Sequence, residues 1–102
     1  MHRLSIIQER IHIIAVTQAQ IEKITALARS YGVRRLILFG SAAENPQEAR
    51  DIDIACDGVS GWNLFELAAK LEEELHLSLD VIPLTPPSRF TKYIESKGRV
   101  LL

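Results

Sequence analysis

The protein has 102 residues, of which 47% are hydrophobic and 25% are charged, a composition typical of one globular domain rather than a disordered or fibrous chain. Its formal net charge of -1 argues against general binding to the polyanionic backbone of DNA or RNA. The single cysteine, Cys56, excludes an internal disulfide and predicts a reducing, cytoplasmic location. No apolar run approaches the ~20 residues that span a bilayer, so no membrane contact is expected.

Residues 1–31 carry two helical patterns, because apolar side chains recur every three or four positions. The first stripe comprises Leu4, Ile7, Ile11 and Ile14, and the second comprises Ile21, Ile24, Leu27 and Ala28. Thr17 followed by Gln20 resembles a capping box, which predicts a new helix after Thr17 and an end at Gly32. One long helix remains an alternative, because no glycine or proline enforces the break. We therefore expect an N-terminal helical extension over residues 1–16, which we hypothesise packs against a second copy or a partner.

The rest of the chain predicts three strands and two helices. Residues 34–40 are a short apolar run that ends in glycine, residues 51–56 alternate polar and apolar side chains, and residues 77–84 form the third strand. A polar loop over residues 42–50 joins the first two strands. A helix capped by Asn63 runs to about Leu75, and a short helix over residues 88–96 precedes an apolar tail. This order predicts an α/β (α+β) fold, a small mixed sheet flanked by helices.

Three aspartates stand where strands would favour apolar residues. Asp51 and Asp53 are two positions apart, so their side chains share one face of a strand and repel each other. Paired carboxylates on a rigid backbone are suited to Mg²⁺, whose remaining ligands are substrate phosphates. Asp80 interrupts the apolar third strand, from which it would share the metal and accept a proton from an attacking hydroxyl.

Gly40 and Ser41 lie at the end of the first strand. Glycine lets a phosphate approach the backbone closely, and serine offers a hydroxyl and an amide to its oxygens. Each of these features alone has an ordinary explanation as a turn, a surface acid or an edge residue. Their order along successive strands is what indicates a phosphoryl-transfer site.

This order resembles the signature of the DNA polymerase β-like nucleotidyltransferase superfamily, most closely its MNT (minimal nucleotidyltransferase) proteins. The resemblance rests on the FGSAA segment at residues 39–43, on Asp51-Ile52-Asp53 after the loop, and on the LDVI segment at residues 79–82. The RRLILFGS segment at residues 34–41 matches the strand that leads into the motif. The similarity covers residues 17–102, which we expect to form the minimal nucleotidyltransferase domain.

The resemblance implies a fold, a site and a reaction. Gly40 and Ser41 would bind a nucleoside triphosphate, and Asp51 and Asp53 would hold two Mg²⁺ ions. Asp80 would bind one of these ions and help to activate the acceptor hydroxyl. The reaction implied is transfer of a nucleoside monophosphate, usually AMP from ATP, with release of pyrophosphate. MNT proteins are commonly paired with a HEPN-domain RNase toxin, which they neutralise by adding AMP to a toxin tyrosine.

Three positions depart from the family pattern. Glu44 and Asn45 stand where the family often has a basic residue and a glycine, and Arg50 replaces a serine before the first acid. A glutamate near a triphosphate is repulsive, whereas Arg50 offers a replacement phosphate contact. An alternative is therefore an antitoxin with a weak or inactive site that neutralises its toxin by binding alone. An enzyme acting on a small molecule such as an aminoglycoside is disfavoured, because such proteins generally carry an additional acceptor domain.

Overall fold

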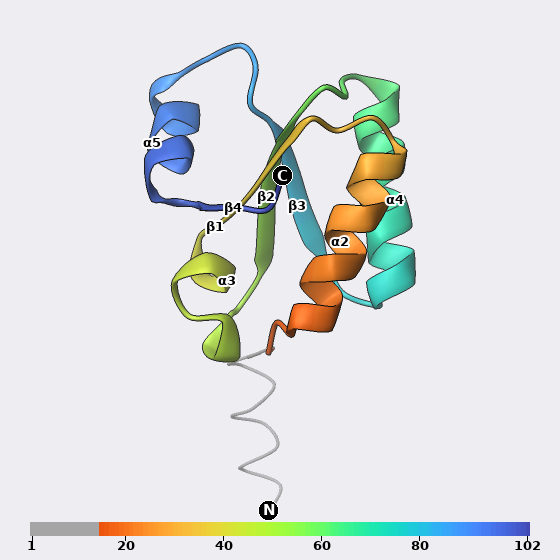
Figure 1. The fold of residues 1–102 in the computed structure, drawn as a ribbon, viewed down its shortest axis with the longest axis vertical. Helices are drawn as coiled ribbons and strands as arrows, with labels where there is room; N and C mark the ends of the chain where they lie inside the picture. Colours follow the sequence, from red (N-terminus) through yellow and green to blue (C-terminus); the bar gives the residue numbers. More distant parts are fainter. Residues whose placement is uncertain (1–14) are drawn as a thin grey trace, which may run out of the picture.

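The computed structural model describes residues 15–102, which form one layer of sheet between two layers of helix (Figure 1). In chain order the elements are α2 (Gln18–Ser30), β1 (Arg35–Phe39), α3 (Ser41–Glu44), a 3₁₀ turn (Pro46–Glu48), β2 (Ile52–Asp57), α4 (Trp62–Leu75), β3 (Leu79–Pro83), α5 (Arg89–Lys97) and β4 (Arg99–Val100). The stripe expected from Leu4 to Ile14 lies outside the described residues. Among residues 15–102 no helix is long and apolar enough to cross a membrane.

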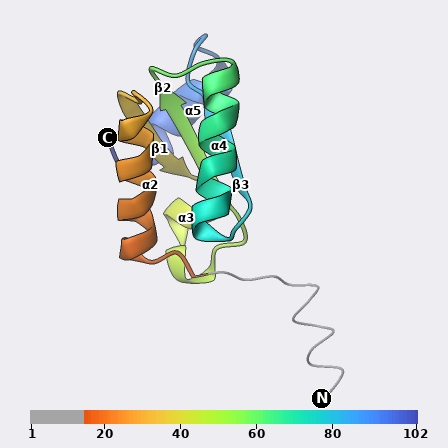
Figure 2. The same ribbon diagram turned by 90° about the vertical axis from the view of Figure 1, so that its right-hand side faces the viewer.

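The sheet has the strand order β3-β2-β1-β4. β1 pairs antiparallel with β2 and with β4, whereas β2 and β3 are parallel and are joined by the crossover helix α4. The mixed sheet that the sequence predicts is therefore confirmed. α2 and α4 lie side by side over one face and run in opposite directions, and α5 covers part of the other face (Figures 1 and 2).

The two faces of the sheet differ in chemistry because side chains alternate along each strand. The main core lies beneath α2 and α4, where the strand residues Leu36, Leu38, Ile52, Ile54 and Cys56 are fully buried. A smaller core lies beneath α5 and consists of Ile37, Ala55, Leu84 and Ile94. The second face is only partly covered, which leaves room on it for polar side chains.

The first helix begins as the sequence predicts. Thr17 is extended, its hydroxyl accepts from the Gln20 amide at 3.1 Å, and the Gln20 side chain accepts from the Thr17 amide at 2.9 Å. This capping box is confirmed, and the extended Thr17 excludes one continuous helix through that position. Val16, placed at the end of the expected extension, is buried in the core, and its amide donates to the Pro46 carbonyl.

Two predictions of local structure were wrong, and one short strand was not predicted. Asn63 does not cap α4; the cap is Gly61, with φ 59°, so the helix begins two residues earlier than expected. The polar loop over residues 42–50 is instead largely helical, with α3 followed by the 3₁₀ turn. The apolar tail begins with a two-residue strand, β4, and beyond it the Leu101 amide donates to the Leu36 carbonyl at 2.8 Å.

Gly98 sets how closely α5 approaches the sheet. A Cβ at this position would collide with the Ile37 side chain and would lie 2.8 Å from the carbonyl oxygen of Ile94 and 2.9 Å from that of Leu38. Two of these neighbours are backbone atoms, which cannot move aside without displacing β1 or the end of α5. The glycine therefore seats α5 on the sheet and allows the chain to turn directly into β4.

We expect Gly98→Ala to lower the free energy of unfolding by about 1–3 kcal/mol, the usual cost of overpacking. Urea denaturation followed by circular dichroism measures this change. Lys92→Ala, at an exposed position on the same helix, is the matched control and should alter stability little. A Gly98→Ala variant as stable as that control would contradict the proposed close contact.

Candidate active site

Two of the three aspartates lie side by side on one face of the sheet. The parallel register pairs Asp53 of β2 with Asp80 of β3, and the antiparallel register pairs Asp53 with Phe39 of β1 on its other side. Because neighbouring strands are ~4.8 Å apart, Asp80, Asp53 and Phe39 form a row across three strands. Asp51 immediately precedes β2, two residues before Asp53. The structure thus brings together the acids that the sequence singles out.

Asp53 is the least solvated of the three acids. It is partly buried, whereas Asp51 and Asp80 are exposed. Burial, the charge of Asp80 with a hydrogen bond to it, and the charge of Asp51 together raise the pKa of Asp53 to about 6. The exposure of Asp80 follows from its place on the edge strand β3. The carboxylates are therefore close enough to repel one another, and a cation among them would relieve that repulsion.

Gly40 is in direct contact with this acid group. Its φ of 69° is a backbone conformation that side-chain-bearing residues rarely adopt. A Cβ added here would lie 2.7 Å from Oδ2 of Asp53. Glycine therefore lets the end of β1 turn beside the carboxylate without displacing it.

Ser41 links the two ends of the connection between β1 and β2. Its Oγ accepts a hydrogen bond from the Arg50 amide at 3.1 Å and lies 3.5 Å from the Asp51 amide. The hydroxyl thus holds the returning chain beside the start of the connection, which places Asp51 next to Gly40 and Ser41. The Arg50 residue is exposed.

The donor set of the site consists of carboxylate oxygens. Within residues 15–102, no three His, Cys, Asp or Glu side chains converge into a ready-made metal cluster. Mg²⁺ is usually held by one or two carboxylates, with water and substrate phosphates as its other ligands. Asp51 and Asp53 therefore fit an ion that arrives together with a phosphorylated substrate, and they do not form a permanent metal cage.

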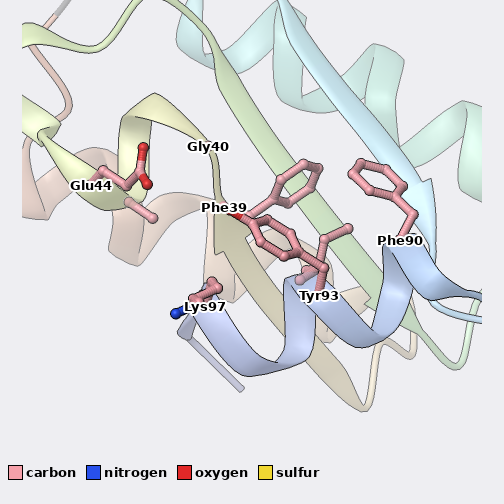
Figure 3. A pocket seen from close by; sticks show the side chains of 8 residues that line it. Phe39, Gly40, Glu44, Phe90, Tyr93 and Lys97 are labelled. Atoms are coloured by element: carbon pink, nitrogen blue, oxygen red, sulfur yellow. The ribbon is translucent and has the colours of Figure 1, made fainter.

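The sequence reasoning missed a hollow of about 250 Å³ beside the acids, between α3 and α5. Its walls include Phe39 and Gly40 at the end of β1, Glu44 at the end of α3, and Phe90 and Tyr93 on α5 (Figure 3). Phe90 and Tyr93 are 55% and 56% exposed. The signal in the sequence was this pair of aromatic residues three positions apart in a short helix whose only other apolar residue is Ile94.

Two neighbouring residues of β2 are not part of the site. Cys56 points into the main core, as its alternation with the aspartates predicts, and burial raises the pKa of its thiol to about 11. Asp57, at the end of the strand, forms an ion pair of 3.5 Å with Arg35. The carboxylates that lie together on this part of the sheet are thus those of Asp51, Asp53 and Asp80.

Comparisons with known proteins agree with this fold. The family model for the polymerase beta nucleotidyltransferase domain matches residues 22–102. A search of curated proteins found no match to the chain.

Several solved structures share the fold. A toxin–antitoxin structure with AMP-PNP is 28% identical with a TM-score of 0.69, over 80% of this chain and 72% of that chain. A tri-AMPylated HEPN toxin from Shewanella oneidensis in complex with its MNT antitoxin gives 27% identity and a TM-score of 0.66, over 83% and 71%. The MntA–HepT toxin–antitoxin structure gives 26% and 0.66, over 84% and 72%.

The raised pKa of Asp53 predicts a pH-dependent stability. Because the pKa in the folded protein, about 6, exceeds the ordinary value of 3.8, the folded state binds this proton more tightly than the unfolded state. Ionised Asp53 therefore destabilises the folded protein. This destabilisation is absent below about pH 4 and grows as the pH rises through 6. We expect Asp53→Asn to raise the melting temperature at pH 7.5 by roughly 2–5 °C, because it removes a partly buried charge near two other acids. Screening by solvent keeps this increase modest.

Thermal unfolding monitored by circular dichroism from pH 4 to 8, without divalent cations, measures this effect. The difference between Asp53→Asn and the wild type should vanish near pH 4. Glu66→Gln, an exposed acid on α4 over the opposite face, is the control and should show no such trend. A constant difference at all pH values would show that the ionised Asp53 carboxylate is not its cause.

Proposed function

The chain belongs to the polymerase beta nucleotidyltransferase family, and we propose that it is a Mg²⁺-dependent nucleotidyltransferase that transfers AMP from ATP to a protein hydroxyl. The observation that supports this most is the row of Asp53 and Asp80 on adjoining strands, with Asp51 and Gly40 beside it. Repelling carboxylates next to a glycine that admits close approach suit a polyphosphate substrate accompanied by cations.

The acids and the phosphate-binding residues have different roles in this proposal. Asp51 and Asp53 would hold two Mg²⁺ ions, and Asp80 would bind one of them. Mg²⁺ supplies positive charge that offsets the charge developing on the phosphoryl oxygens. Gly40 and Ser41 contact the triphosphate through their amides, and the Arg50 guanidinium adds a charge-assisted contact from the returning chain.

Asp80 is suited to receive a proton because it is exposed on the edge strand β3, where an acceptor hydroxyl can reach it. The acceptor hydroxyl loses its proton to Asp80 as its oxygen bonds to the α-phosphorus. The bond between the α-phosphorus and the bridging oxygen breaks, and pyrophosphate leaves with the electron pair. The acceptor keeps AMP.

We further propose that the acceptor belongs to a HEPN-type RNase toxin, for which this protein is the antitoxin. The support comes from the related complexes, in one of which a tri-AMPylated HEPN toxin is bound to its MNT antitoxin. The region of similarity covers 71% of the matched chain in that complex. Residues 17–102 form the transferase domain in this proposal, and the stripe from Leu4 to Ile14 remains a predicted contact surface for a partner or a second copy.

A second candidate function is neutralisation of the toxin by contact alone. The observation in its favour is Glu44, which lines the hollow beside Gly40 and adds a negative charge where a triphosphate is to bind. Under this alternative the acids are remnants of a transferase, and substituting them leaves protection from the toxin intact.

Incubation with radiolabelled ATP, Mg²⁺ and a HEPN-type RNase toxin should transfer label to that toxin. We expect Asp53→Ala to reduce the rate by at least about 100-fold, because it removes a charge-stabilising group at the reacting phosphate. Chelation of divalent cations with EDTA should abolish the transfer.

Glu66→Gln is the matched control, because it removes an exposed acid from α4, and it should retain full transfer. Cell survival on toxin expression separates the two candidate functions. Loss of protection in the Asp53→Ala variant supports catalysis. Retained protection together with no transfer by the wild type supports neutralisation by contact and contradicts the enzymatic proposal.

A further inference from the structure

The hollow between α3 and α5 combines exposed aromatic rings with two charged side chains, Glu44 and Lys97. We propose that it holds the purine base of the nucleotide whose phosphates bind at Gly40 and the acids. The inference rests on the proposed nucleotidyl transfer, and it assigns the part of the substrate that the acids cannot recognise.

The position of the hollow is the first argument. Phe39, in its wall, is the direct cross-strand partner of Asp53, so the hollow starts about one strand spacing, ~5 Å, from the acid. Gly40 contributes both to the hollow and to the close contact with the Asp53 carboxylate. A nucleotide with its phosphates at Asp53 and Gly40 therefore has the hollow as its nearest apolar neighbour.

The second argument is the set of aromatic rings. Phe39 and Phe90 meet edge to face, with ring centroids 5.9 Å apart and an interplanar angle of 85°. Tyr93 lies beside them on α5 and leaves more than half of its surface in solvent. Figure 3 shows the three rings gathered on one side of the hollow. Exposed rings of this kind are platforms on which a flat base stacks.

The charged residues of the rim are the third argument. Glu44 and Lys97 lie on the side of the hollow away from the rings (Figure 3), and within residues 15–102 neither takes part in an ion pair. A purine offers hydrogen-bond donors and acceptors along one edge while its faces stack. The carboxylate accepts from an exocyclic or ring N–H, and the ammonium donates to a ring nitrogen or oxygen.

A tyrosine of the acceptor protein fits this hollow less well. A phenol has one polar group, which must face the acids in order to react. A tyrosine seated here would direct that hydroxyl out of the hollow and leave Glu44 and Lys97 without partners on the ligand. A base, in contrast, uses the rings and both charged groups at once.

Glu44 thereby acquires a favourable role. In the sequence it stands where a basic residue would attract phosphate, and its charge is repulsive for that purpose. In the structure Glu44 lines the hollow together with the aromatic residues. Its carboxylate therefore serves the base end of the substrate, while the phosphate end lies at Gly40 and Ser41.

Isothermal titration of the full-length protein with ATP and with inorganic tripolyphosphate, both in Mg²⁺, tests the proposal. We expect Tyr93→Leu and Phe90→Leu each to weaken ATP binding by roughly 5- to 100-fold, the range of base–aromatic stacking. Tripolyphosphate binding should change less than about twofold, because it has no base to stack. Thermal melting confirms that each variant is folded, and either variant alone suffices for the test.

Phe65→Leu is the matched control: it removes a ring that is 64% exposed on α4, and its ATP affinity should equal that of the wild type. The wild type should also bind ATP or GTP more tightly than CTP. Equal binding of ATP, CTP and tripolyphosphate overturns the base pocket while leaving nucleotidyl transfer standing. Absence of binding to all three overturns both proposals.

Discussion

The alternation of side chains along β2 is the constraint on which the rest of the structure depends. Ile52 and Ile54 are fully buried beneath α2 and α4, and this burial allows only one register. A slip of one residue would expose both isoleucines and drive Asp53 into the core, at a cost of several kcal/mol for an unpaired carboxylate. The apolar face of the strand therefore determines where the acids stand, and the crossover through α4 then brings Asp80 level with Asp53.

The same constraint makes the acid group unfavourable in the protein alone. Burial of Asp53 and the repulsion among the acids together raise the pKa of its carboxyl group, and no basic side chain is among the causes of that shift. Folding tolerates the repulsion because Asp51 and Asp80 remain in water and the core on the other side of β2 is well packed. Acids that repel one another in this way favour any ligand that brings positive charge, because a ligand that binds only the folded protein stabilises it.

The sequence predicted the elements whose signals are local. Alternation at residues 51–56 identified β2, and Thr17 with Gln20 identified the start of α2. It did not predict β4, because two residues become a strand only by pairing with β1, a contact distant in sequence. It placed the cap of α4 at Asn63 rather than Gly61, because polar side chains are usual caps and a glycine with φ 59° is not visible in a pattern. The hollow depends on how α5 sits on the sheet, which no periodicity reveals.

Gly40 joins the two halves of the candidate site. On one side its lack of a side chain leaves space for Asp53, and on the other side it lies in the wall of the aromatic hollow. Gly98 has the matching effect at the far wall, because it lets α5 carry Phe90 and Tyr93 close to β1. The β2 register positions the acids and the two glycines bring the hollow beside them, so the polar and apolar parts of the site follow from backbone packing. A substrate with a charged end and a flat aromatic end is the kind of molecule that uses both.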